Sequence, residues 1–578
     1  MHTVSIKNKM PKKPPEIIYG VEDDPPLPTC FLLGLQHIFI VTISLIFPVV
    51  IVRAIGGTPE QAGFMVSMSM LAAGIGTILQ ALNKKGIGSG YLCPSVCGPS
   101  YLSASLLAAK TGGLSLLFGM TAIAGSFEVL LSRVMHRLRA LFPAEVTGLV
   151  VTMVGISVIP TAVTNFIGID STDTITEIPE LIVAFITLGV MVGITVRSKG
   201  RLKLYSVLIG MILGYIAAFL FNILNVSHIE QFLQAPLVAF PDLEYFRWSF
   251  DLVLLVPFLI AIICSTLKSV GDITTCQKIN DIEWKRPDMK NIGGGILSDG
   301  MSAIISGLVG AMGQSTSSSN VGLSIGTGAT SRRIAYATGS TLVFLAFLPK
   351  LATVFVIMPK PVMGAALIYA VSFMVVAGIQ IITSRMLDAR KTFVVGIPLI
   401  LGLSVDALPK LYENVPPWVQ PLFSSSLALA TVLAVILNLI LRLGIAQRQQ
   451  LILEPGVDSS EKIFAFMEKQ GSAWGARKEV IYRAISALNE FFESVSMLGL
   501  TKGKITADVS FDEFNLDIDI LYKGALMEIL TTRPTETELL RDKVTTNKLA
   551  GFLITEYVDS VKSDVKDGLC HVHFHLDH

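Results

Sequence analysis

The side chains best placed to do chemistry in this chain are hydroxyls and amides that interrupt long apolar segments. One polar stretch covers residues 315–328 and is rich in Ser, Thr and Asn. Lipid does not tolerate unpaired backbone groups, so this stretch is expected to line a cavity inside the protein. A second interruption, Cys93–Tyr101, is broken by Gly and Pro in the first half of the chain. Two broken apolar segments in corresponding halves indicate the binding site of a secondary transporter.

Composition narrows the class of protein further. The chain has 578 residues, a mean hydropathy of +0.64 and only 15% charged residues. These values fit a polytopic membrane protein and no soluble class. The net charge of +1 implies no polyanionic partner such as a nucleic acid. The six cysteines are scattered and give no disulfide framework, and no motif indicates a cofactor.

About fourteen apolar runs have the length that crossing a bilayer demands. Lys and Arg cluster after every even-numbered run, as at Arg332 and Arg333 after the tenth, and they are sparse after the odd-numbered ones. By the positive-inside rule both termini are therefore expected in the cytoplasm. The runs lie approximately at 29–53, 62–80, 91–109, 113–132, 143–163, 178–197, 203–224, 251–275, 291–313, 315–330, 335–357, 362–384, 391–408 and 422–442.

Seven segments in each half is an odd number, so two related halves must lie inverted in the membrane, as in many secondary transporters. The interrupted segments occupy the third position of each half. A half-helix beginning near Ser100 is therefore expected to face one beginning near Asn320. Their N-terminal ends, which carry partial positive charge, would meet near the middle of the membrane.

Several short motifs in order give residues 29–442 a resemblance to the nucleobase–cation symporters, also called nucleobase–ascorbate transporters or xanthine/uracil permeases. Each motif alone is weak, and together they are specific. They are Gly34-Leu35-Gln36-His37, Gly98-Pro99-Ser100-Tyr101, Phe142-Pro143-Ala144-Glu145-Val146-Thr147-Gly148, Val154-Gly155-Ile156-Ser157-Val158-Ile159-Pro160, Ser265-Thr266-Leu267-Lys268-Ser269-Val270-Gly271-Asp272, Ser298-Asp299-Gly300 and Met358-Pro359-Lys360-Pro361-Val362-Met363-Gly364.

The resemblance implies a fold of fourteen segments arranged as two domains after a cytoplasmic N-terminal tail at 1–28. A core domain would comprise about 29–132 and 251–357, and a gate domain about 143–224 and 362–442. Short strands in segments three and ten build the substrate site in this family. Its members are often dimers that move the core against the gate, and this chain is expected to be a homodimer in contact with membrane lipid.

The family signature in segment ten is matched in part. Asn320, Gly322, Thr327 and Gly328 fit it, whereas Ser319 replaces a Gln or Glu. The resemblance implies that the replaced residue contacts substrate, so Ser319 is predicted to contact it too. Because the serine side chain is shorter, it leaves more room there. Asn320 would cap the half-helix, bridge the two strands or touch the ligand. Thr327 is predicted to bond the backbone or to pack.

Lys268 is the sharpest departure from the family, which has a Glu there that hydrogen-bonds the nucleobase ring. An ammonium only donates hydrogen bonds, so the exchange favours substrate oxygens or negative charge. An anionic purine, such as urate or deprotonated xanthine, or another organic anion then becomes a candidate substrate. The alternative is that Lys268 pairs internally with Asp272 or Asp299.

The coupling ion is left open, with a preference for the proton over Na⁺ or uniport. Asp272, Asp299 and His37 are candidate carriers, since an acid inside a membrane is costly to keep without a role. His37 and its neighbour Gln36 could equally hold core helices together. Tyr101 would stack on a planar base or belong to the core.

Residues 449–578 change composition and are predicted to form a small cytoplasmic α/β domain. The expected order is a helix at 477–498, strands at 504–510 and 514–522, a helix at 535–562 and a strand at 569–577. The region resembles a histidine-kinase-type ATPase fold, as in anti-sigma-factor kinases. It lacks the nucleotide-binding loop and the metal-binding Asn, so regulation or binding of a cytoplasmic partner is expected.

Three histidines alternate on the last predicted strand, so one face carries His571, His573 and His575. They could bind zinc or nickel. No Cys or acid at ligand spacing in the sequence completes such a site, and no metal is assigned.

The sequence thus predicts an inner-membrane secondary transporter that imports a purine, with xanthine or urate favoured, by motion of the core against the gate. The alternatives are a transporter of a non-nucleobase organic anion and a ligand sensor that signals through the tail. An enzyme is not expected, because no nucleophile–base pair or metal constellation is present. The predicted substrate contacts are Ser100, Tyr101, Lys268, Ser319, Asn320 and Gly322.

Overall fold

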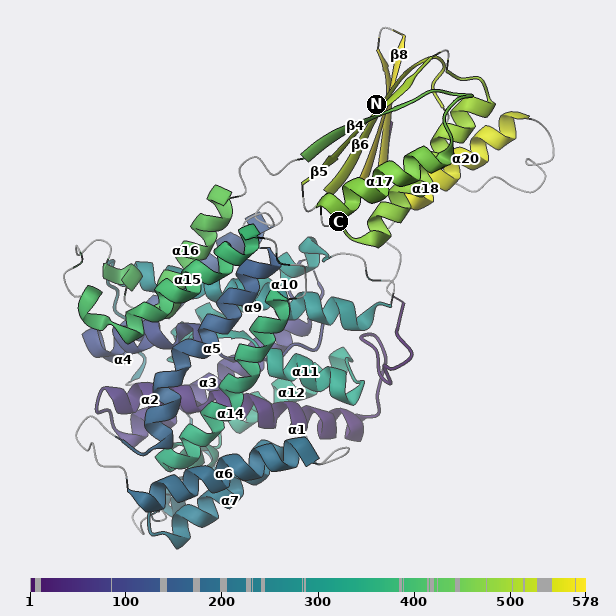
Figure 1. Ribbon diagram of the computed structural model, residues 1–578. Helices are drawn as coiled ribbons and strands as arrows, with labels where there is room; N and C mark the ends of the chain where they lie inside the picture. The colour runs from purple at the N-terminus through teal and green to yellow at the C-terminus, as the bar shows by residue number, and fades with distance from the viewer. Residues whose placement is uncertain are drawn as a thin grey trace. The chain divides into compact units, whose positions relative to one another are not determined.

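The protein folds as two units, described here from a computed structural model (Figure 1). One unit comprises Pro11–Leu441, and the other joins Met1–Met10 to Arg442–His578. The structure describes residues 2–5, 12–84, 86–135, 143–169, 177–197, 205–224, 230, 232–240, 245–282, 284, 287–383, 387, 389–412, 415, 420–423, 425–441, 447–474, 476–501, 503–512, 515–527, 543–566 and 568–577.

The first unit is helical, and among its described residues eight helices are long and apolar enough to cross a membrane. A ninth span is reached if α12 and α13, which meet at 85°, count as one. The helices are α1 Leu27–Ser44, α2 Ile46–Ala54, α3 Pro59–Ala81, α4 Leu102–Val134, α5 Ala144–Phe166, α6 Ile178–Arg197, α7 Ser206–Leu220, α9 Leu255–Asn280, α10 Met289–Val309, α11 Ser318–Thr327, α12 Arg332–Leu345, α13 Pro349–Val356, α14 Lys360–Ile382, α15 Ala389–Ala407 and α16 Ser426–Leu441.

Each predicted segment overlaps one or two of these helices, and in segments three and ten a strand comes first. Segments three and ten are the interrupted ones, as predicted: β2 Ser95–Cys97 precedes α4, and β3 Gln314–Thr316 precedes α11. Segments three and four are joined in one long helix, α4, whose regular geometry breaks at Gly112 and Gly113. The positive φ of 72° at Gly113 is a conformation that suits glycine. The membrane crossing of all fourteen segments stays a prediction.

The packing of the helices has a regular symmetry. With β2 and the start of α4 counted as segment three, α3 and α12 are segments two and eleven, and the rest of α4 and α10 are segments four and nine. Helix α3 packs on α12, and α4 packs on α10. Moving every segment seven places along the series of fourteen turns the first pair into the second. The pair α6 with α7 exchanges with α15 and α16 in the same way. The contacts of α5 with α14 and of β2 with β3 map onto themselves. This is the pattern that an inverted repeat would give, and the repeat itself stays a prediction.

The α5–α14 contact is built on glycines, which let two helices approach closely inside a membrane. A Cβ added at Gly148 would lie 2.7 Å from the backbone nitrogen of Ile382. One added at Gly378 would lie 2.5 Å from the backbone nitrogen of Thr152. Both distances are too short for a carbon, so this crossing has no room for side chains.

We therefore predict that Gly148→Ala or Gly378→Ala lowers the melting temperature of the purified protein. Overpacking a tight contact costs about 1–3 kcal/mol, and here the opposing atoms are backbone. Gly193→Ala on α6 is the matched control, since its added Cβ meets nothing within 4 Å. Equal melting temperatures for all three variants, measured by differential scanning fluorimetry, would contradict a close α5–α14 crossing.

The second unit is an α/β layer with a six-stranded antiparallel sheet in the order β1-β7-β8-β6-β5-β4. Helices α17, α18 and α20 gather on one face of the sheet (Figure 1). Alternate apolar residues of β5, β6 and β8 are buried in the core, and the other residues of these strands form the opposite face. The elements are β1 His2–Ser5, β4 Gln447–Leu453, α17 Ser460–Trp474, α18 Lys478–Met497, β5 Ile505–Phe511, β6 Asn515–Lys523, α20 Lys543–Tyr557, β7 Ser560–Lys566 and β8 Leu569–Asp577.

The sequence prediction for this unit was partly wrong. The helix expected at 535–562 ends at Tyr557, and Ser560–Lys566 is the strand β7, because alternating polar side chains there suit a half-buried strand. Residues 535–542 lie outside the described part. The elements β4 and α17 were missed. The order of the other elements agrees with the prediction, and the resemblance to an ATPase fold stays a prediction.

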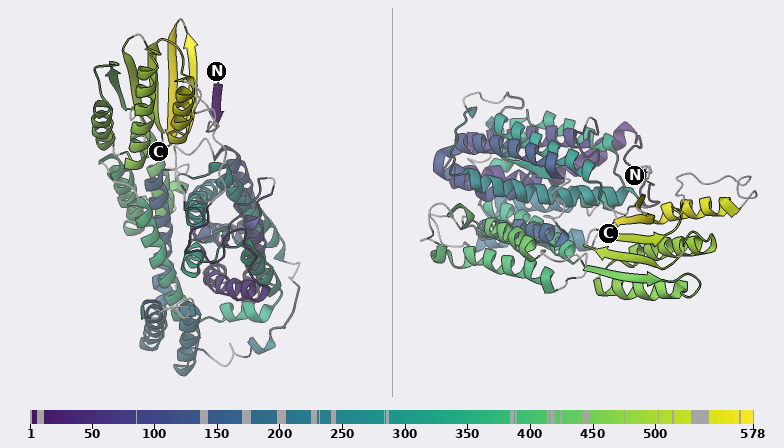
Figure 2. Two further views of the ribbon diagram at one scale, coloured as in Figure 1. Left: turned by 90° about the vertical axis from the view of Figure 1, so that its right-hand side faces the viewer. Right: turned by 90° about the horizontal axis from the view of Figure 1, so that it is seen from above.

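Strand β1, near the start of the chain, was also not predicted. It pairs with β7 at the edge of the sheet (Figure 2), with His2 opposite Ser563. Residues near both ends of the chain therefore belong to one folded unit.

Candidate functional site

The centre of the membrane unit is a pair of three-residue antiparallel strands, β2 and β3. Ser95 lies opposite Thr316, and Cys97 lies opposite Gln314. Each strand satisfies the backbone groups of the other, which a broken membrane segment needs. Each strand leads directly into the N-terminus of a helix, α4 after β2 and α11 after β3. The sequence analysis expected two such half-helices facing each other.

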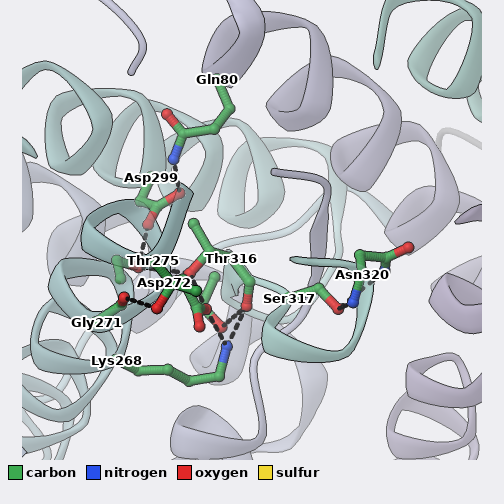
Figure 3. Close-up of polar contacts among 11 residues, drawn as sticks. Gln80, Lys268, Gly271, Asp272, Thr275, Asp299, Thr316, Ser317 and Asn320 are labelled. Carbon is green, nitrogen blue, oxygen red and sulfur yellow. Dashed lines mark hydrogen bonds and ion pairs between the residues drawn. The ribbon is translucent and has the colours of Figure 1, made fainter. Parts of the chain in front are cut away.

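Lys268 points from α9 to the end of β3 (Figure 3). Its Nζ donates to the backbone oxygen of Thr316 and lies 3.2 Å from Asp272 Oδ2, one turn further along the helix. The hydroxyl of Thr316 donates to the same Asp272 oxygen over 2.7 Å. All three side chains are buried. Lys268 and Asp272 thus form a buried ion pair that ties α9 to β3.

Asp299 on α10 joins this group from another side. Its Oδ2 accepts a hydrogen bond from Ser269 Oγ, and its Oδ1 accepts one from Gln80 Nε2 over 3.3 Å. Ser269 also lies 3.1 Å from the hydroxyl of Thr316. The carboxyl of Asp299 is therefore linked through neutral groups to the strand that the ion pair holds. Lys268 pairs with Asp272, and no ion pair with Asp299 is present among the described residues.

Asn320 connects the start of α11 to α1. Its Oδ1 lies 2.8 Å from His37 Nδ1, so His37 carries a proton on that nitrogen if the amide is oriented as shown. Its Nδ2 donates to Ser317 Oγ over 2.9 Å, and Ser317 in turn caps the helix by accepting from the Asn320 backbone nitrogen. Asn320 and His37 are both buried. The asparagine thus fixes the helix that follows β3.

The side chain of Tyr101 packs beside the strand pair and is fully buried. Its ring fills the space beside two glycines, since a Cβ at Gly313 or Gly98 would lie 2.6 or 2.9 Å from ring atoms. Its hydroxyl donates to Glu128 Oε2 over 3.3 Å, and Thr266 Oγ1 donates to Glu128 Oε1 over 3.1 Å. The ring thus packs against the glycines that flank the two strands.

The remaining predicted site residues lie in different surroundings. Ser319 and Gly322 are exposed on α11, on the side away from His37. Gln36 donates to the hydroxyl of Tyr205 over 3.3 Å, and Thr327 Oγ1 donates to the Leu323 carbonyl within its own helix. These residues therefore do not belong to the Lys268–Asp272–Asp299 group.

Ser100 is buried next to a small cavity at the start of α4. The cavity has a volume of about 10 Å³, and its lining includes Ser100, Ser103, Pro257 and Ser425. That is room for roughly one water molecule. The Oγ of Ser100 has no hydrogen-bond partner among the described residues, and no side chain caps this helix end. A small molecule in this cavity would thus meet the unpaired hydroxyl of Ser100.

Sequence reasoning missed two members of the site. Glu128 is a single acid in the apolar helix α4, and that signal was available because an ionisable residue inside a membrane is usually functional. Thr316 joins Lys268, Asp272 and Ser269, yet in the sequence it is one hydroxyl among many. Only the pairing register of β3 shows that Thr316, and not a neighbouring hydroxyl, faces these side chains.

The apolar helices and the paired broken segments define a polytopic helical membrane transporter. Residues 29–411 match the Permease family, and the chain belongs to this family. The resemblance found in the sequence is thereby confirmed, and the protein is a permease, not an enzyme.

Similar proteins share most of the membrane unit. CPE0397 of Clostridium perfringens, provisionally named a purine permease, is 30% identical over 74% of this chain and 93% of its own length. Xanthine permease XanQ of Escherichia coli K12 is 29% identical over 78% of this chain and 98% of its own length. Xanthine permease XanP of the same organism is 28% identical over 74% and 94%.

A solved structure shows the same fold at low identity. Murine Solute Carrier 26 family member A9, an anion transporter in the inward-facing state, aligns with a TM-score of 0.51 and 11% identity. The alignment covers 75% of this chain and 71% of that chain. The likeness concerns the fold alone.

The ion pair gives a test of what Lys268 does for stability. Removing one member of a buried pair costs about 3–5 kcal/mol, because the other charge is left uncompensated. We predict that Lys268→Met and Asp272→Asn each lower the melting temperature by several degrees, and that the double variant recovers at least half of the loss. Lys110→Met, at an exposed lysine, is the control. Strictly additive losses in the double variant would show that the two side chains are not coupled.

Proposed function

We propose that the protein is a secondary transporter that imports a purine nucleobase, with xanthine or urate favoured, across the inner membrane. The observation that carries the proposal is the β2–β3 pair with polar side chains of α9 and α10 at its end, in a chain whose relatives are named xanthine permeases. Two helices that begin beside the strands suit a planar ligand rich in oxygen and nitrogen, since helix N-termini carry partial positive charge.

The transport cycle that we propose moves the core against the gate. Elements of both predicted domains border the cavity beside Ser100, where Pro257 of α9 faces Ser425 near the start of α16. At about 10 Å³ this space is far too small for a purine. Withdrawal of the gate helices would enlarge it and open the start of α4 to substrate. Ser100 and the exposed Ser319 are the hydroxyls that we propose to meet the ligand.

Lys268 is proposed to act on the substrate through its charge and through its hold on β3. Its ammonium bonds the Thr316 carbonyl, so it both fixes the strand and leaves the strand end more positive than a glutamate would. A purine with acidic N–H groups and several oxo groups is favoured there over a neutral base. In this proposal Lys268 is both a site residue and a member of an internal ion pair, the two interpretations that the sequence left open.

Proton coupling is proposed to use Asp299, with Glu128 as a second candidate. Asp272 is paired with a lysine, whereas Asp299 and Glu128 accept hydrogen bonds from hydroxyls and an amide. A buried carboxyl with neutral partners can hold a proton without breaking an ion pair. Asp299 is preferred because Ser269 connects it to Thr316, and so to the strand that borders the substrate.

Counterflow in proteoliposomes tests the activity directly. Vesicles loaded with unlabelled xanthine should take up labelled xanthine against the label's gradient, and Asn320→Ala should slow this exchange at least tenfold by releasing α11 from α1. Thr327→Val, at a hydroxyl that bonds only its own helix, is the control. Exchange of carboxylates without any nucleobase would favour the organic-anion alternative, and binding without flux would favour a sensor.

The substrate order tests the charge of Lys268. We predict that Lys268→Gln shifts preference from xanthine and urate toward neutral bases such as hypoxanthine or uracil, by about tenfold in relative KM, which corresponds to about 1.4 kcal/mol. Lys268→Arg, which keeps the charge, should retain the order. Competition of each base against labelled xanthine gives the measurement. An unchanged order in Lys268→Gln would restrict Lys268 to a structural role.

Coupling is tested by separating exchange from accumulation. Exchange needs no net proton movement, whereas uphill uptake does. We predict that Asp299→Asn retains at least half of the counterflow rate and loses accumulation driven by an inward proton gradient. Glu128→Gln should keep both. The reverse result would make Glu128 the carrier, and intact accumulation in both variants would exclude the two acids.

A further inference from the structure

The uncovered face of the cytoplasmic sheet gathers histidines and acids from two neighbouring strands. In the register of β6 with β8, Asp517 lies opposite His575 and Asp519 lies opposite His573. Directly opposed residues point to the same side of a sheet, within reach of one another. Their neighbours Ile518 and Phe574 point to the other side and are fully buried in the core of the unit.

Three of these side chains place donor atoms around one point. Asp517 Oδ1 lies 2.6 Å from His575 Nδ1 and 3.6 Å from His573 Nε2. One ligand atom from each of the three residues falls within 4.8 Å of the others. In a tetrahedral zinc site with bonds of about 2.0–2.1 Å, donors are about 3.3 Å apart. The arrangement therefore needs shifts of less than about one ångström to enclose an ion.

A fourth residue, Asp519, orients one of the histidines. Asp519 Oδ1 lies 2.8 Å from His573 Nδ1 and 3.0 Å from His571 Nε2. A carboxylate on one ring nitrogen holds the proton there and turns the lone pair of the other nitrogen outward, as in carboxylate–histidine–zinc triads.

The three donor residues are half-buried and fixed, unlike most surface histidines. Their side chains are 25–30% exposed, and they stand on adjacent strands whose backbone cannot rotate them apart. A groove of about 380 Å³ lies beside the site over β4, β5 and β6, with Asp508 and Asp519 among its lining residues. The donors are nitrogen and oxygen, which suit zinc, nickel or cobalt better than magnesium or calcium.

We propose that Asp517 Oδ1, His573 Nε2 and His575 Nδ1 bind one divalent transition-metal ion, zinc in preference, with Asp519 as a positioning residue. The ion crosslinks β6 to β8 and leaves a coordination position open to water or to a partner's side chain. No metal is assigned from the sequence alone, because no Cys or acid at ligand spacing completes the site there. The acids come instead from β6, more than fifty residues earlier in the chain.

The test measures zinc bound to the purified full-length protein carrying no polyhistidine tag. After treatment with a chelator and addition of Zn²⁺, we expect about one ion per chain by mass spectrometry of the metal, and a rise in melting temperature. Co²⁺ should give visible absorption bands of a four-coordinate N/O site. Asp517→Asn and His573→Asn should lose the ion, and Asp519→Asn should weaken binding about 10- to 100-fold.

His571→Asn is the matched control, because His571 touches Asp519 and lies outside the donor set. It should keep one ion per chain. Melting temperatures without metal, equal to that of the unaltered protein, will show that each variant is folded. Absence of stoichiometric zinc, or binding that survives both Asp517→Asn and His573→Asn, overturns the proposal.

Discussion

The membrane unit depends on two strands of three residues that satisfy each other's backbone. Inside a membrane, an irregular segment is tolerated only where its N–H and C=O groups find partners within the protein. The pairing of β2 with β3 supplies those partners and brings the starts of α4 and α11 together. Everything that we assign to the substrate site is positioned relative to this pair.

Buried polar contacts hold the pair in place from several sides. Lys268 and Asp272 fasten the end of β3 to α9, and Asn320 fastens the helix after it to α1. The ring of Tyr101 supports the strands where glycine leaves room. Such a network is costly if any member is missing, because the partner left behind is a buried unpaired group. The same groups that build the site are therefore expected to stabilise the fold.

Much of this architecture could be predicted from the sequence, because bilayer thickness and broken apolar runs are strong signals. The helices overlap the predicted apolar runs, and the two interruptions lie where they were predicted. The contacts could not be predicted. The sequence could not show that Lys268 bonds a carbonyl of β3, or that Ser319 lies on the exposed side of α11, because both depend on strand register and helix rotation.

The second unit, the one with the six-stranded sheet, shows the same limit. Alternation predicted the strands β5, β6 and β8, but not β7, whose side chains are mostly polar. The histidines of β8 looked isolated in the sequence, and the acids that face them became visible only when β6 was placed beside them. Pairing between distant segments thus decides both the substrate site and the proposed metal site.

Hydrogen–deuterium exchange with and without xanthine tests the central claim most directly, because it locates binding as well as detecting it. If the ligand binds at the strand pair, the peptides containing Ser95–Cys97 and Gln314–Thr316, with the first turns of α4 and α11, will exchange more slowly when xanthine is present. The exposed helix α6 will be unchanged. Protection confined to other segments, or no protection by any nucleobase at saturating concentration, would contradict this account.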